Sequence, residues 1–184
     1  MNANQQEIGL VQDETAEADA VRAARAGSTD ALGELFRLYA DAVLTVAYRI
    51  TGSRADAEDV LQDVFVGLGR ALRAYDERGR FDAWLRKVAV RTALMRLRGA
   101  RRKRELPLDA RQEAPAGEEA RQLSRLELER ALARLPEGLR IVFMLKEVEG
   151  YGHAEIAELL DITPGASMTR LSRAWSALKR AMGA

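Results

Sequence analysis

The sequence contains no cysteine, a single histidine (His153) and only 4 prolines in 184 residues. Without cysteine there is no disulfide and no thiolate metal site, and one histidine excludes a cluster of histidine ligands. His153 is also the sole candidate for acid–base catalysis, and no nucleophile lies beside it in the sequence. We therefore expect no metal site, no cofactor and no catalytic residues, and we expect that the chain is not an enzyme.

Long apolar runs are absent as well. No stretch approaches the ~20 apolar residues that a membrane helix requires, and residues 1–19 are polar and acidic, unlike a signal peptide. The sequence therefore predicts a soluble, cytoplasmic protein. Its net charge is only +1, so binding to nucleic acid would require cations gathered locally. β-Branched runs are scarce while Ala, Leu, Arg and Glu dominate, which predicts an all-α fold.

Apolar residues recur at helical spacing in two groups, which predicts two small helical domains. Residues 105–119 contain two prolines, a glycine and an excess of acids, which is typical of a flexible linker. The expected parts are a mobile N-terminal tail (1–25), a first domain (26–104), a linker (105–122) and a second domain (123–184). The first domain should hold three helices, at about 31–50, 53–72 and 81–98.

The predicted helix faces follow from this spacing. Leu32, Leu35, Phe36, Tyr39, Val43, Val46 and Ile50 form the apolar stripe of the first helix. In the second, we expect burial of Val60, Leu61, Val64, Phe65, Leu68 and Leu72. In the third, we expect burial of Phe81, Trp84, Leu85, Val88, Thr92 and Met95.

Charge is strongly segregated within the first domain. Asp56, Asp59 and Asp63 are spaced i, i+3 and i+7, so they share one helix face. Such a face is also compatible with simple solvation and with the dipole at a helix N-terminus. The following stretch, 70–104, holds 13 Lys/Arg against 3 Asp/Glu, which is more than the capping of a helix end requires. An acidic surface for a basic protein partner and a basic surface for a phosphate backbone are therefore both expected.

The second domain contains a helix-turn-helix pattern. A short helix from His153 is followed by the turn Asp161-Ile162-Thr163 and by a longer helix that begins at Pro164. Thr163 and Pro164 suit the cap and the first helical position. No acid occurs from Pro164 to Ala184, which favours a helix laid in the major groove of DNA.

Taken in order, these segments resemble a bacterial sigma factor, specifically the two-domain extracytoplasmic-function (ECF) group of the sigma-70 family. The resemblance covers about Ala26–Arg104 (sigma region 2) and Leu123–Met182 (sigma region 4). It rests on the residues from Asp56 to Phe65, Phe81-Asp82-Ala83-Trp84-Leu85, Val88-Ala89, Leu135-Pro136-Glu137, Val142-Phe143, Glu149-Gly150 and Glu155-Ile156-Ala157-Glu158.

The resemblance implies three binding surfaces. Core RNA polymerase, through the clamp helices of its β′ subunit and also through β, is expected to contact Asp56, Asp59, Gln62, Asp63 and Phe65. Melted minus-ten DNA is expected to contact Arg78, Arg80, Lys87, Arg91, Arg98, Arg101 and Arg102. Duplex minus-thirty-five DNA is expected to contact Thr163, Ser167, Met168, Thr169, Arg170 and Arg173. An anti-sigma factor is a further expected partner.

The sequence departs from the family pattern at several of these positions. Arg91 replaces the usual Asn, Met95 replaces a residue that is often polar or acidic, and Met168 replaces a common Lys. Gly152 stands in place of a Ser cap, and Asp161 in place of a turn Gly.

Two functions are compatible with the second domain. One is a promoter-specificity subunit of RNA polymerase, and the other is a helix-turn-helix regulator that acts without being a polymerase subunit. The acidic helix and the basic loop and helix of the first domain favour the former, because a plain regulator has no need of a surface that holds melted DNA.

Overall fold

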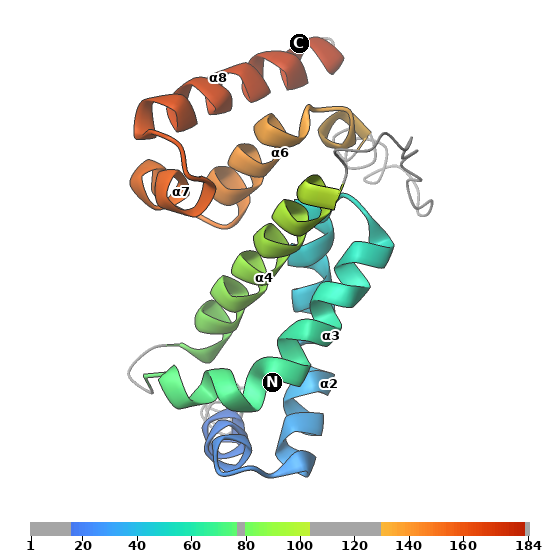
Figure 1. Ribbon diagram of the computed structural model, residues 1–184, viewed down its shortest axis with the longest axis vertical. Helices are drawn as coiled ribbons and strands as arrows, with labels where there is room; N and C mark the ends of the chain where they lie inside the picture. The colour runs from blue at the N-terminus through green and yellow to red at the C-terminus, as the bar shows by residue number, and fades with distance from the viewer. Residues whose placement is uncertain (1–15, 77–79, 104–129, 183–184) are drawn as a thin grey trace, which may run out of the picture. The chain divides into compact units, whose positions relative to one another are not determined.

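The computed structural model describes residues 16–76, 80–103 and 130–182, and every regular element in these ranges is helical (Figure 1). The predicted all-α class is therefore confirmed. Residues 16–25 and 130–133 are helical, and the other elements are α2 (Thr29–Thr51), α3 (Arg54–Ala71), the 3-10 turn η1 (Leu72–Ala74), α4 (Phe81–Lys103), α6 (Glu137–Phe143), the π-helical turn η2 (Met144–Val148), α7 (His153–Leu160) and α8 (Pro164–Ala181). The predicted linker, 105–122, lies outside the described residues.

By its internal contacts the chain divides into two compact units. The first is formed by Met1–Ala47 and Ala57–Thr92, and the second by Tyr48–Asp56 and Ala93–Ala184. The second unit thus includes the end of α2, the start of α3 and the second half of α4. The predicted boundaries, which assign each of these helices to a single domain, remain predictions.

In the first unit, the apolar stripes of α2 and α3 bury most of the residues expected. Leu35, Val43, Val60, Val64 and Leu68 are each at most 2% exposed. The expectation is wrong for Phe36, which is 44% exposed, and Leu61 and Phe65 are only half-buried. The helices instead bury Ala31 and Ala57, because small side chains allow two helix backbones to approach closely.

The prediction of a mobile tail is corrected for residues 16–25. This segment is a helix that buries Ala20, Val21 and Ala24, and the hydroxyl of Tyr39 on α2 donates a hydrogen bond to the carboxylate of Glu17. Two of the three buried residues are alanines, which give a weak periodic signal in the sequence. Burial, and next the hydrogen bond to Glu17, raise the pKa of Tyr39 above its ordinary range.

The buried face of α4 also differs from the prediction. Phe81 and Leu85 are buried as expected, but Met95 is 68% exposed. The remaining core positions are taken by Ala89, Val90, Ala93 and Leu94. The prediction favours large apolar residues such as Trp84 and Met95 as core positions. In the structure, small residues of α4 fill part of the core, because alanines also recur at helical spacing.

In the second unit, residues 131–135, α6, η2 and α8 enclose a small core. It consists of Ala131, Leu132, Leu135, Phe143, Met144, Ala174 and Leu178, with Leu139, Leu171 and Ala177 packed against it. Thr163 caps α8 as predicted, since its Oγ1 accepts a hydrogen bond from the amide of Ala166 at 3.1 Å, and Pro164 follows in the first turn. The predicted helix, tight turn and longer helix are thus present (Figure 1).

A buried arginine, Arg140 of α6, also belongs to the second unit. It is 5% exposed, and its Nη2 donates a hydrogen bond to the carbonyl oxygen of Thr51 at 3.3 Å. Gly52 ends α2 with φ +71°, and a Cβ atom there would lie 2.6 Å from this Nη2. Burial lowers the pKa of Arg140, and Glu137 partly opposes that change. Glycine is thus required at position 52 both by its conformation and by the close guanidinium.

The turn between α7 and α8 contains Asp161 in the left-handed conformation, with φ 54° and ψ 53°. Glycine adopts this conformation without steric cost, so Asp161→Gly should raise the free energy of unfolding by about 0.5–1 kcal/mol. Thermal denaturation of the full chain measures the change. Asp161→Ala is the control and should lower stability, because alanine has neither the freedom of glycine nor the polar side chain of aspartate. Equal stability of the three proteins would contradict this account.

The hydrogen bond between Tyr39 and Glu17 predicts a pH effect. A raised pKa in the folded state means that the contribution of Tyr39 is complete below the unfolded pKa of about 10 and is lost as pH rises further. Tyr39→Phe should lower stability at neutral pH by about 1 kcal/mol, through loss of the hydrogen bond. Above pH 10 the difference from wild type should shrink. Denaturant titrations at pH 7 and above pH 10 test this, and a constant difference would show that Tyr39 does not titrate as described.

Candidate functional site

The acidic surface of α3 is set by the residues that the helix buries. Ala57, Val60, Val64 and Leu68 face the core, so the other residues of α3 lie on the flanks or the outer face of the helix. Gln62 and Asp63 are exposed, whereas Asp59 and Phe65 are half-buried. The predicted polymerase contacts Asp59, Gln62, Asp63 and Phe65 therefore all reach the surface of this helix.

Asp56 differs from the other predicted contacts. Its amide donates to Ser53 Oγ at 3.3 Å, so Ser53 caps α3. Its carboxylate pairs with Arg96, with Oδ1 3.0 Å from Nε, and both groups are about one-third exposed. The ion pair with Arg96 gives the Asp56 carboxylate a structural role within the chain. The presence of an acid at this position therefore has an explanation that does not involve a partner protein.

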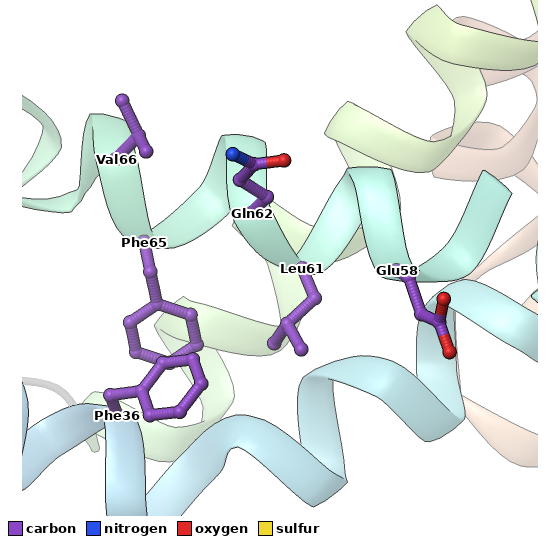
Figure 2. Close-up of a pocket in the computed structure, with 6 residues that line it drawn as sticks. All are labelled: Phe36, Glu58, Leu61, Gln62, Phe65 and Val66. Carbon is purple, nitrogen blue, oxygen red and sulfur yellow. The ribbon is translucent and has the colours of Figure 1, made fainter. Parts of the chain in front are cut away.

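An apolar groove of about 420 Å³ lies beside these carboxylates, between α2 and α3. It is lined by Phe36, Glu58, Leu61, Gln62, Phe65 and Val66. Figure 2 shows the rings of Phe36 and Phe65 packed against each other and Leu61 pointing toward α2. The two ring centroids are 4.9 Å apart, with an interplanar angle of 71°. Val66, at the rim, is 81% exposed, so the groove offers apolar surface bordered by polar and acidic groups.

The sequence pattern does not predict this groove, because Phe36, Leu61 and Phe65 fit the helical stripes and are therefore expected in the core. The signal that would have found it is the width of the stripes, because α3 has apolar residues at both Val60 and Leu61 and at both Val64 and Phe65. The valine of each pair is buried in the core, and Leu61 and Phe65 line the groove.

Along α4, exposed cations share one face. Lys87, Arg91 and Arg98 are all exposed, at helical spacing, and Met95 lies within the same row. Arg98 also donates to the backbone carbonyl of Leu159 at the end of α7, a contact inside the second unit. Arg101 and Arg102 continue the helix, and Arg78 lies outside the described residues.

Four aromatic side chains pack together where the chain enters α4. Tyr75 contacts both Phe81 and Trp84, with ring centroids 5.6 and 5.0 Å apart, and Phe81 also contacts Tyr39 at 5.3 Å. This cluster fixes the backbone on both sides of residues 77–79. Arg80 is anchored to Asp82 by two hydrogen bonds, from Nε at 3.1 Å and from Nη2 at 2.9 Å. Its side chain is nevertheless 84% exposed.

On α8, the structure corrects the role expected for Ser167. Its side chain is 0% exposed, and its Oγ lies 2.9 Å from Nδ1 of His153. Ser167 is therefore a core residue with no exposed surface. His153, in turn, is a partly buried packing residue, and its partner had no signal in the sequence because the two residues lie on different helices.

The remaining predicted residues of α8 divide between two faces. Met168, Thr169 and Arg173 are exposed, and Ser172, which sequence reasoning did not single out, is exposed between them. Arg170 is half-buried, and its Nη1 would lie 3.8 Å from a Cβ atom on Gly138 of α6. Arg170 is therefore directed along α6, whereas Met168, Thr169 and Arg173 point to solvent.

The described part of the chain offers neither a metal site nor a membrane-spanning helix. No group of three or more His, Cys, Asp or Glu side chains in these residues could hold a metal ion. In the same ranges, no helix combines the length and the apolar character that crossing a bilayer requires. The surfaces that remain are the groove with its carboxylates, the cationic face of α4 and the exposed face of α8.

Comparison with known proteins assigns these surfaces to a family. Residues 35–103 match the model of Sigma-70 region 2, and residues 125–178 match that of Sigma-70, region 4. The RNA polymerase sigma factor CarQ of Myxococcus xanthus is 32% identical over 164 residues, which cover 86% of this chain and 93% of CarQ. The ECF RNA polymerase sigma factor SigE of Mycolicibacterium smegmatis is 35% identical over 147 residues, covering 76% of this chain and 57% of SigE.

Solved structures agree with this assignment. CnrH, in complex with the cytosolic domain of CnrY, is 28% identical with a TM-score of 0.54, and the match covers 91% of this chain and 97% of CnrH. The sigma factor RpoE of Bartonella quintana, in complex with the anti-sigma factor NepR, has the same fold with a TM-score of 0.60 at 19% identity, covering 82% of this chain and 96% of RpoE. The chain therefore belongs to the extracytoplasmic-function group of the sigma-70 family, the RNA polymerase sigma factors that recognise promoters.

Proposed function

We propose that this chain binds core RNA polymerase through α3 and its groove, holds melted minus-ten DNA with α4, and places α8 in the minus-thirty-five duplex. The observation that carries the proposal is an apolar groove between α2 and α3, lined also by Glu58, together with a face of exposed cations on α4. A regulator that binds only duplex DNA needs neither surface. The chain itself makes and breaks no bond, and it acts in the cytoplasm, where the polymerase is.

The groove suits a helical segment of the polymerase that is apolar on one side and basic on its flanks. Phe36, Leu61 and Phe65 supply apolar surface for the centre of such a contact, where burial contributes most to affinity. Glu58 lines the groove, and Asp63 is an exposed acid further along the same helix. Such charges outside the apolar centre speed encounter and select a cationic partner. This is the chemistry we assign to the β′ clamp helices.

The cationic face of α4 suits a single strand. Lys87 and Arg91 are exposed one helical turn apart, a spacing that lets both reach a phosphate backbone. The aromatic cluster of Tyr75, Phe81 and Trp84 holds the backbone next to residues 77–79 rigid. A rigid support lowers the entropy lost when an unstacked base is held there.

An anti-sigma factor is a proposed further partner. CnrH, at 28% identity, is known in complex with the cytosolic domain of CnrY, which shows that a protein of this fold is captured by a second chain. The groove on α3 provides this chain with apolar surface for such a contact.

Promoter-dependent initiation by core polymerase tests the proposal directly. With the full chain added, transcription in vitro should start at specific sites, and without it none should. Asp63→Lys should weaken polymerase binding about tenfold, because a cation would then meet a basic partner. Asp41→Lys is the matched control, since Asp41 is an exposed acid on α2 and not on α3, and it should bind like wild type. Equal binding of both variants would reject α3 as the docking surface, and absence of any initiation would reject the sigma function.

Arg91 provides a test of the minus-ten surface. Arg91→Ala should change the preferred base at one minus-ten position, because an arginine that reads a base edge discriminates among bases. Initiation from promoters with each base at each minus-ten position measures the preference, with Arg37→Ala on α2 as the exposed-arginine control. A uniform loss on all promoters, with the salt dependence reduced by about one unit on a log–log plot, would instead make Arg91 a phosphate contact.

A further inference from the structure

The exposed face at the start of α8 carries one large apolar side chain, Met168, beside a glycine and two small hydroxyl residues. Met168 is 56% exposed, and Gly165, Thr169 and Ser172 are exposed beside it. The hydroxyl of Thr169 donates to the carbonyl oxygen of Gly165 at 2.9 Å. This back-bond uses the one proton that the hydroxyl could donate.

No cation of α8 lies beside Met168 in the first two turns. Arg170 is half-buried and directed along α6, beside Gly138. Arg173 is exposed but lies five residues after Met168, which is about 140° around the helix. Lys179 returns to within about 20° of Met168, but it lies three turns further along. These cations therefore differ from Met168 either in direction around α8 or in position along it, and none lies beside it on the same turn.

The fold fixes this orientation of Met168. Its preceding neighbour, Ser167, is fully buried and bonded to His153, and Ala174 and Leu178 are buried on the same side. α8 therefore cannot rotate to replace Met168 by a polar residue without exposing this core. Methionine is unbranched and long enough to reach a base edge, and its sulfur is only a weak acceptor.

The major groove of DNA carries one prominent apolar group, the C5-methyl of thymine. We propose that Met168 is a specificity-determining residue that selects a thymine in the minus-thirty-five duplex by contact with this methyl group. The inference rests on the proposed function, because it assumes that α8 enters the major groove. It assigns the recognition to apolar contact, whereas the charged residues of α8 contribute affinity that does not depend on sequence.

The experiment uses the full chain with core polymerase and a promoter library randomised in the minus-thirty-five region. The promoters that bind wild-type holoenzyme should share a thymine at one or more positions. Each such thymine is then replaced by deoxyuridine, which removes the methyl group and leaves base pairing intact. At the position facing Met168, this should weaken wild-type binding about fourfold.

The variants connect that loss to the side chain. Met168→Ala should bind the selected promoter about fourfold more weakly and should not distinguish thymine from deoxyuridine. Met182→Ala is the matched control: Met182 is 49% exposed at the other end of α8, and this variant should keep the full effect of deoxyuridine.

Three results would overturn the inference: no enriched thymine, equal binding of thymine and deoxyuridine by wild type, or a deoxyuridine effect that persists in Met168→Ala. In each of these cases initiation by the wild-type holoenzyme can still be intact, so the sigma function survives. If wild type initiates from no member of the library, the proposed function itself fails.

Discussion

The hydrogen bond between Ser167 and His153 and the burial of Ala174 and Leu178 together determine which side of α8 faces solvent. A helix exposes different side chains with every 100° of rotation about its axis, and the hydrogen bond adds a directional constraint to the apolar packing. An unpaired hydroxyl in the core is costly, so Ser167 is held where Nδ1 of His153 meets it. Met168, Thr169 and Arg173 face outward as a consequence.

On α3, too, the buried residues determine which side chains face outward, but here they are all apolar. Burial of Ala57, Val60, Val64 and Leu68 leaves Leu61 and Phe65 on the flank of the helix, where Phe36 of α2 meets them (Figure 2). The groove exists because the apolar stripes of both helices are wider than the core that they enclose. The acids of α3 occupy sequence positions next to its apolar residues. The apolar and the charged surface of this helix therefore lie side by side.

Much of this organisation is predictable from the sequence. Features that depend on neighbouring residues in the sequence can be predicted from it. They include the helices, the cap at Thr163, the left-handed turn at Asp161 and the end of α2 at Gly52. What could not be predicted depends on contacts between distant residues. The bond from Ser167 to His153, the pairing of Asp56 with Arg96 and the exposure of Met95 each require knowing which helix faces lie together. Large apolar residues were accordingly assigned to the core where small ones belonged.

Exposed methionines on both cationic helices suggest how affinity and specificity are divided. Met95 is 68% exposed among the cations of α4, and Met168 is 56% exposed on α8. Arginine and lysine bind phosphates of any sequence, and their contribution falls as salt rises. A methionine contributes only where the nucleic acid presents apolar surface, and its contribution is nearly independent of salt. Raising the salt concentration should therefore weaken binding to all DNA while leaving the preference due to Met168 unchanged, because the contact that selects carries no charge.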